Sequence, residues 1–344
     1  MKIAIITSGV LPVPAVQGGA VENLIDYALE YNDKHQLHDI TVYSVFHPKV
    51  KFHPALNSII NKYVYINTNT FLFKYISKIR VYLGYGYYYH HRLEYFFECT
   101  WRRMKKEKYD LIIIENRPCF AIPLSERTST PIISHIHTNL LYEPIPIFQK
   151  AVLATKRFLV VSNFIKKEIL KVGIDTDIQI VYNGIDKTIF HRELVPTIDR
   201  KKYGLNYNDF VAVFWGRLVP KKGIKDLLLA MTLLKDYADI KLVIIGSINF
   251  EDTEHQTNSF IEELRTIAES IPGKIIFTGF IPYNKMPEYI SLGNVAVVPS
   301  QINEALGMTC IEACAMGLPV IATNDGGIPE TLIGQKHIII EKGL

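Results

Sequence analysis

The chain has 344 residues, 48% of them hydrophobic, and carries a formal net charge of +4. This length suggests about two domains, and so mild a charge gives no argument for a nucleic-acid partner. The four cysteines include no CxxC pair, which favours core thiols in a reducing cytoplasm over a structural disulfide. No apolar run reaches the roughly 18–20 residues that a membrane-spanning helix needs. The apolar N-terminus is expected to form a buried strand rather than a signal peptide, because no cleavage region follows it.

Short apolar runs alternate with helical patterns along the chain, which predicts parallel strands covered by helices on both faces. The first series of strands is expected at Lys2–Thr7, Asp39–Val45, Leu111–Glu115, Ile132–Ile136, Phe158–Val161 and Ile178–Tyr182. The second series is expected at Phe210–Trp215, Lys241–Ile245, Lys274–Thr278, Val295–Pro299 and Pro319–Ala322. The polar stretch 186–209 between them indicates a linker with a first short helix. We therefore predict an α/β protein with two Rossmann-like domains, residues 1–186 and 187–344. Their parallel sheets would face a central cleft and bind ligands at the carboxyl ends of their strands.

Two loops of the first series carry candidate binding residues. Gly18 and Gly19 follow the first strand and open a helix, where backbone amides could approach a phosphate. The pattern is not GxGxxG, and an ordinary turn between strand and helix is an equal alternative. His135 and His137 end another strand and point to the same face, because they are two residues apart. That spacing could serve a metal, but no third ligand is obvious nearby, and a core or cleft histidine is the simpler interpretation.

The second series places two cations in one loop. Arg217 and Lys222 lie between the strand Phe210–Trp215 and a helix predicted over Ile224–Leu234. Arginine offers forked hydrogen bonds and lysine a point charge, which together suit a diphosphate. A solvated basic turn is the alternative. The backbone around Ile281, after the strand at Lys274–Thr278, could bind the edge of a nucleotide base.

A second loop of this series leads into a helix with a clear beginning and end. Glu304 precedes Gly307, and the helix is expected to begin near Met308 and to end at Gly317, with Pro just beyond. The free N–H groups of its first turn, near Met308 and Thr309, form a ready anion site.

Glu312 would lie about one turn into this helix, roughly 6 Å along its axis. A nucleotide-sugar fits this layout, with the diphosphate at the helix N-terminus, ribose hydroxyls on Glu312 and sugar hydroxyls on Glu304. Two glutamates at this spacing are weak evidence alone, since many helices carry such pairs on a solvated face.

The Glu304-x7-Glu312 pattern after a strand, followed by Gly317-Leu-Pro-Val-Ile-Ala-Thr323, resembles the retaining glycosyltransferases of family 4, which have the GT-B fold. Other segments match in the expected order, and the resemblance covers nearly the whole chain. It implies a hexosyltransferase-type enzyme that moves a sugar from a nucleotide-diphosphate sugar, with UDP preferred. The acceptor would be a hydroxyl of a glycan or polyprenol-linked glycan in capsule, exopolysaccharide or lipopolysaccharide synthesis.

The resemblance also implies roles for single residues. Arg217 and Lys222 would hold the leaving diphosphate, and His137 would lie at the donor sugar, with His135 as the fallback. Gly19 would contact the diphosphate or the acceptor. We expect no cofactor and no metal, because Asp175-Thr-Asp177, which matches a DxD metal motif, precedes a strand instead of following one and is interpreted as a surface turn. The leaving phosphate can accept the acceptor's proton.

Two alternatives remain at this stage. A sugar-nucleotide epimerase of the same fold would need no acceptor, and a non-catalytic subunit would bind a partner transferase. The second alternative arises because the sequence stops at Leu344, soon after a short strand at Ile338–Glu341. Family members usually continue through further helices, so we expect the usual C-terminal helices to be lacking.

The segment 74–108 combines nine Lys or Arg with three Glu and many aromatic residues. Its apolar residues Leu93, Phe97, Trp101 and Met104 recur at helical spacing, which more often marks a core face. Basic residues with Tyr and Trp also suit an anionic membrane surface. The enzyme is therefore expected in the cytoplasm, with peripheral contact at the inner face of the membrane as an alternative.

Overall fold

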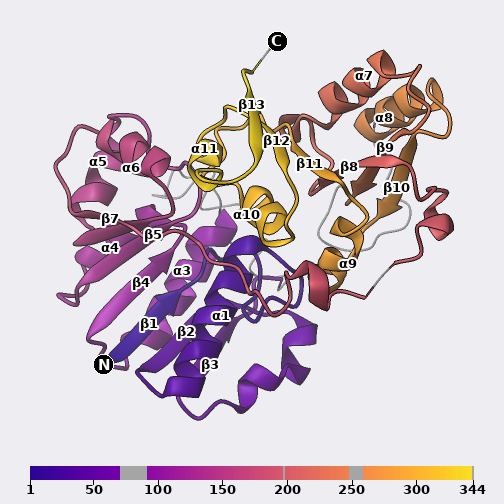
Figure 1. The fold of residues 1–344 in the computed structure, drawn as a ribbon. Coiled ribbons are helices and arrows are strands. Elements are labelled where there is room, and N and C mark those ends of the chain that lie inside the picture. Colours follow the sequence, from indigo (N-terminus) through magenta and orange to yellow (C-terminus); the bar gives the residue numbers. More distant parts are fainter. Residues whose placement is uncertain (70–90, 197, 248–258, 343–344) are drawn as a thin grey trace. The chain divides into compact units, whose positions relative to one another are not determined.

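The computed structural model describes residues 1–69, 91–196, 198–247 and 259–342. The chain divides into two compact units, Met1–Tyr182 and Asn183–Leu344 (Figure 1). The predicted boundary after residue 186 lies in the linker that opens the second unit.

The first unit is built on a seven-stranded sheet in which every neighbouring pair is parallel, in the order β3-β2-β1-β4-β5-β6-β7. Its strands are β1 (Lys2–Ile6), β2 (Asp39–Val45), β3 (Asn61–Ile66), β4 (Leu111–Glu115), β5 (Ile132–Ile136), β6 (Arg157–Val160) and β7 (Ile178–Ile180). Its α-helices are α1 (Ala20–His35), α3 (His91–Met104), α4 (Ala121–Ser125), α5 (Pro146–Leu153) and α6 (Asn163–Leu170). Short 3-10 turns lie at Pro48–Phe52, Pro54–Asn57 and Pro118–Phe120.

Both faces of the first sheet are buried. Along β1, Ala4 and Ile6 belong to one apolar cluster, whereas Ile3 and Ile5 belong to another. Successive side chains of a strand point to opposite faces, so the two clusters cover the two faces of the sheet. This confirms the predicted pattern of continuous apolar strands between layers of helices.

Helix α3 confirms the core interpretation of its apolar stripe. Phe97 and Met104 are buried in the first cluster, and Leu93 and Trp101 pack against it. The remainder of the basic, aromatic segment, residues 74–90, lies outside the described residues.

The second unit contains a six-stranded parallel sheet in the order β10-β9-β8-β11-β12-β13. Its strands are β8 (Phe210–Trp215), β9 (Ile240–Ile245), β10 (Ile275–Gly279), β11 (Val295–Val298), β12 (Val320–Thr323) and β13 (His337–Ile340). Its α-helices are α7 (Ile224–Leu233), α8 (Ser259–Glu269), α9 (Met286–Ile290), α10 (Met308–Ala315) and α11 (Ile328–Thr331). Short 3-10 turns lie at Arg192–Leu194, Arg200–Tyr203, Pro220–Lys222 and Tyr283–Lys285. The short helix expected in the linker is thus a pair of 3-10 turns.

Strand β3 was not predicted, because its sequence Asn61-Lys-Tyr-Val-Tyr-Ile66 alternates and contains an exposed Lys62 at the edge of the sheet. The four cysteines are all free thiols, as expected. Across the described ranges, the helices are too short or too polar to cross a bilayer.

Each sheet reverses its strand order at one place, where ligands bind in doubly wound folds. In the first unit this place lies between β1 and β4, and in the second between β8 and β11. The loops that follow these strands therefore hold the candidate site residues.

Candidate active site

The loop after β8 and the loop after β11 meet through an ion pair. The Nζ of Lys222 lies 2.6 Å from the Oε2 of Glu304, and the two side chains are 19% and 20% exposed. The Ser300 hydroxyl donates a further hydrogen bond to the same oxygen, at 3.3 Å. The sequence placed Lys222 on the diphosphate and Glu304 on the sugar. The structure brings the two charges into direct contact, so a ligand that binds either one must rearrange or share this pair.

A buried carboxylate shapes the backbone that carries Glu304. Asp325 is fully buried, and its two oxygens accept from the backbone N–H groups of Asn303 (3.0 Å) and Glu304 (2.9 Å). Asn303 has a φ of +57°, a backbone conformation that Asn tolerates better than most residues. Lys342 forms an ion pair with Asp325.

The two glycines after Asp325 complete this support. A Cβ on Gly326 would lie 2.1 Å from the carbonyl oxygen of Glu304, and one on Gly327 would lie 2.4 Å from that of Ala305. In the sequence, Asp325 before a Gly-Gly pair indicates only a turn, because its backbone partners lie more than 20 residues away.

Helix α10 begins at Met308, as predicted, directly after Gly307 with a φ of +91°. A Cβ on Gly307 would lie 2.9 Å from the Cγ1 of Ile328, so packing as well as backbone conformation requires glycine. The first N–H groups of a helix lack partners within it, and here they include those of Met308 and Thr309. The helix ends at Ala315, and Gly317 follows with a φ of +70°.

Glu312 lies one turn into α10 and is only 6% exposed. Its carboxylate accepts from the Nε1 of Trp215 at 2.6 Å and from the hydroxyl of Tyr283 at 3.2 Å. Burial raises the pKa of Glu312 to about 7, against the opposing effect of these donors. Sequence reasoning missed both partners, since Trp215 ends β8 and Tyr283 follows β10. Glu312 is therefore an interior group, and a ribose would have to share its oxygens with these two donors.

The other candidate residues of the second unit are described by their burial. Arg217 is partly buried after Gly216, which has a φ of +137°. Lys221 is exposed. Ile281 is partly buried against the core of the second unit. Their roles toward a nucleotide stay predictions.

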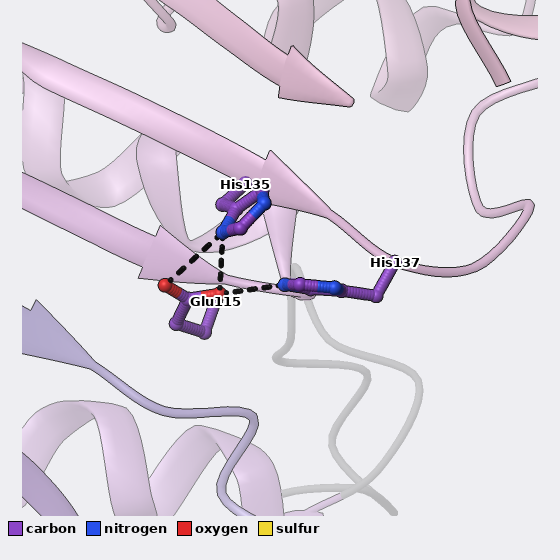
Figure 2. A group of neighbouring side chains, drawn as sticks. All are labelled: Glu115, His135 and His137. Carbon is purple, nitrogen blue, oxygen red and sulfur yellow. Dashed lines mark hydrogen bonds and ion pairs between the residues drawn. The ribbon is translucent and has the colours of Figure 1, made fainter. Parts of the chain in front are cut away.

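In the first unit, His135 and His137 share one carboxylate (Figure 2). The register of the sheet places Glu115, the last residue of β4, beside His135 of β5. The Oε2 of Glu115 lies 3.2 Å from the Nδ1 of His135 and 3.0 Å from the Nε2 of His137. The side chain of Asn116 accepts from the backbone N–H of His137 at 3.1 Å, which holds that residue just beyond the strand.

This arrangement corrects the expectation that no third metal-ligating group lies near the two histidines. Glu115 precedes them by about twenty residues, and only the pairing of β4 with β5 brings it close. Burial alone would raise the pKa of Glu115, but interactions with His135 and His137 outweigh it and lower that pKa to about 2. Burial lowers the pKa of His137, which favours a neutral imidazole at pH 7.

Gly19 lies directly against the buried carboxyl group of Glu22, which occupies the space that a side chain at position 19 would need. Its φ is +107°, and a Cβ on it would lie 2.2 Å from the Oε2 of Glu22 in the first turn of α1. Glu22 is 5% exposed and accepts from the hydroxyl of Ser8 at 3.4 Å. Whether Gly19 also contacts a substrate stays a prediction.

A fold of two parallel-sheet Rossmann-like units is typical of glycosyltransferases with the GT-B fold, and comparison with known proteins agrees. The chain matches the family "Glycosyltransferase Family 4" over residues 21–188 and "Glycosyl transferases group 1" over residues 196–343. It is 30% identical to the putative glycosyltransferase YtcC of Bacillus subtilis, over 96% of this chain and 77% of that protein.

More distant relatives extend this picture. The chain is 24% identical to the lipopolysaccharide 1,2-N-acetylglucosaminetransferase of Salmonella typhimurium, over 67% of this chain and 59% of that protein. Its fold is similar to that of Anabaena HepE, solved in complex with UDP and glucose, with a TM-score of 0.68 and 18% identity over 100% of this chain and 86% of that one. The protein therefore belongs to glycosyltransferase family 4, has the GT-B fold and is a glycosyltransferase.

Proposed function

We propose that this enzyme transfers a sugar from a UDP-sugar, with retention of configuration, to a hydroxyl of a glycan or lipid-linked glycan. The observation that carries the proposal is the contact of Lys222 with Glu304 beside the N-terminus of α10. A cation, a carboxylate and free backbone N–H groups at one end of a sheet suit a sugar diphosphate. The complex of HepE with UDP and glucose supports this class of donor.

The proposed mechanism is electrostatic. Negative charge grows on the diphosphate as its bond to the sugar breaks. Arg217, Lys222 and the amides of Met308 and Thr309 would stabilise that charge, and each such donor typically contributes a factor of about 10²–10³ in rate. Glu304 would bind hydroxyls of the sugar. The leaving phosphate would take the acceptor's proton, so transfer would proceed without a metal ion or cofactor.

Two further roles belong to the same proposal. Neutral His137 in the first unit would accept or donate a hydrogen bond at the donor sugar, and Glu312 would bind the ribose. The acceptor is proposed to be a surface polysaccharide precursor at the cytoplasmic face of the membrane. The name of the Salmonella relative, a lipopolysaccharide transferase, supports a glycan acceptor.

A thermal-shift panel tests the donor class. UDP, GDP, dTDP and their common sugars are added to the wild type and to Arg217→Ala, Lys222→Ala and Lys221→Ala. A ligand at 100 times its dissociation constant stabilises by about 2.7 kcal/mol. We expect a shift with UDP that is lost in Arg217→Ala and Lys222→Ala and retained in Lys221→Ala, the exposed neighbour. A shift with GDP or dTDP alone would correct the nucleotide, and equal shifts in all variants would refute the assigned cations.

A second experiment tests the reaction. The enzyme is treated with EDTA and given the donor identified by the panel together with candidate acceptors. NMR of the product then reports the configuration at the anomeric carbon. Retention without added metal is the expected result. An inverted product, or activity that EDTA abolishes and divalent ions restore, would refute this mechanism.

A further inference from the structure

A cluster of metal-ligating groups lies in the first unit. Among the residues that the structure describes, Glu115, His135 and His137 form one group whose three ligand atoms all lie within 4.8 Å of one another. Both imidazole nitrogens face the same carboxylate oxygen, at 3.2 Å and 3.0 Å (Figure 2). Ligand atoms held about 2.0–2.1 Å from a tetrahedral ion lie about 3.3–3.4 Å apart. The two separations between nitrogen and oxygen are thus close to those of a metal site, and the two nitrogens lie within 4.8 Å of each other.

The sheet holds the three groups in place. Glu115 and His135 are register partners on adjacent strands, and the backbone of His137 is fixed by the side chain of Asn116. Side chains mounted on strands keep a more definite geometry than those on loops. Glu115 and His137 are buried, whereas 19% of the His135 side chain is exposed. His135 is thus the most exposed of the three side chains.

The three ligand groups determine which metal ions the site would bind. Two imidazoles and one carboxylate are ligands that Zn²⁺ and neighbouring divalent transition metals accept, with a fourth position left for water. Oxygen-rich sites for Mg²⁺ or Ca²⁺ have a different composition. The outer nitrogens, Nε2 of His135 and Nδ1 of His137, are buried without a hydrogen-bond partner among the described residues. Since outer partners of ligating histidines typically strengthen metal binding 10–100-fold, the expected affinity is modest.

We propose that Glu115, His135 and His137 bind Zn²⁺ or a similar divalent transition-metal ion, and that the bound ion inhibits sugar transfer. The inhibitory part rests on the proposed role of His137 at the donor sugar, because coordination would replace the hydrogen bond between its Nε2 and Glu115 and fix its ring in one orientation. The bound metal ion would thus inhibit a reaction that is itself proposed to need no metal. The sites of the leaving diphosphate, in the second unit, would be unaffected.

Metal binding is tested first, in the absence of any substrate. The full chain is freed of metal with a chelator, dialysed and titrated with Zn²⁺ by calorimetry and with Co²⁺ by visible absorption. The variants are His135→Asn, Glu115→Gln and, as the matched control, His35→Asn on the exposed surface of α1. We expect one zinc ion per wild-type chain, with intense visible bands typical of tetrahedral Co²⁺. Affinity should fall at least about tenfold in His135→Asn and Glu115→Gln and stay unchanged in His35→Asn.

Circular dichroism of the metal-free proteins shows whether each variant folds, and Glu115→Gln decides the outcome if His135→Asn does not. The site is refuted if the wild type binds no ion, or if a folded His135→Asn or Glu115→Gln variant binds it as tightly as the wild type.

Activity is tested second. Zn²⁺ at a concentration that fills the site should lower the transfer rate of the wild type at least tenfold, and EDTA should restore it. Each variant is compared with its own metal-free rate, and His135→Asn should lose this sensitivity. Zinc that binds without altering the rate would refute the inhibitory role and leave the site. Zinc binding in a chain that shows no transfer with any donor would count against the proposed function and not against the metal site.

Discussion

The Nζ of Lys222 lies 2.6 Å from the Oε2 of Glu304, with about a fifth of each side chain exposed (19% and 20%). The pair joins the loop after β8 to the loop after β11, where the strand order of the second sheet reverses. A largely buried charge that loses its partner is costly, so the two residues should behave as one functional unit.

Removing either charge should therefore reduce turnover strongly. Lys222→Ala is expected to lower kcat by about 10²–10³, the usual effect of losing one stabilising donor, and Glu304→Gln should also lose turnover. The double variant should lose less than the product of the two single effects, because residues in contact are not additive. Steady-state kinetics on the four proteins measures this coupling. Lys221→Ala is the control, and near-normal activity in Glu304→Gln would contradict its assigned role.

Asp325 should position Glu304 without touching a substrate. Asp325→Asn replaces an acceptor that serves two backbone N–H groups, and hydrogen bonds to charged groups contribute about 1.5–3 kcal/mol each. We expect the free energy of unfolding to fall by about 1–3 kcal/mol and kcat to fall more than the affinity for UDP, because the loop of Glu304 relaxes while the cations remain. Urea unfolding and steady-state kinetics measure the two effects.

Asp175→Asn, at an exposed aspartate of the first unit, controls for the substitution itself. If Asp325→Asn weakened UDP binding and kcat to the same degree, Asp325 would act on the fold as a whole rather than on the position of Glu304.

Much of the fold could be predicted from the sequence, because apolar runs and turn residues are local signals. The bounds of β2, β4, β5 and β8 agree with the prediction to the residue. Strand β3 was missed because an edge strand with exposed residues has no continuous apolar run. For the candidate site, the sequence predicts residues within single loops but not the contacts between loops. Glu304, Lys222 and the beginning of α10 follow from motifs, whereas their partners do not.

Those partners come together only through the folding of distant segments. The hydrogen bond from Trp215 to Glu312 spans 97 positions, and the ion pair of Lys222 and Glu304 spans 82. Glu115 reaches His137 through the pairing of two strands that are separated by a helix. A sequence motif names residues that lie near one another in the chain, so it cannot show which distant donor or acceptor completes the site.

Glu312 should make the stability of the second unit depend on pH. Its pKa is raised to about 7 in the folded protein from an ordinary value of 4.5. The folded state then binds more protons than the unfolded state between these values, so stability falls as pH rises through this window and levels off above it. A shift of this size corresponds to about 3 kcal/mol.

Glu312→Gln should remove this dependence while keeping an oxygen for Trp215 or Tyr283. Urea unfolding of the wild type and variant at pH 5, 6, 7 and 8 gives the difference between them, in which other groups cancel. We expect the variant to gain about 2.5 kcal/mol relative to the wild type between pH 5 and pH 8. A difference that stays constant with pH would show that Glu312 titrates alike in both states. Glu193→Gln, at an exposed glutamate, is the control.

Gly326 should be required for packing against the loop of Glu304, beyond its backbone conformation. Gly326 and Gly334 both have positive φ, +56° and +77°, but only a Cβ on Gly326 would meet backbone atoms, with the Glu304 carbonyl oxygen 2.1 Å away. Gly334 has open space around it.

Gly334→Ala should therefore lower the stability only through its unfavourable positive φ, by about 1–2 kcal/mol. Gly326→Ala should cost clearly more and displace the Glu304 backbone, so turnover should fall as well. Thermal unfolding and kcat of both variants measure these losses of stability and turnover. Equal losses of stability with unchanged kcat would contradict the prediction. They would show that the loop moves away from the new methyl group without affecting the site.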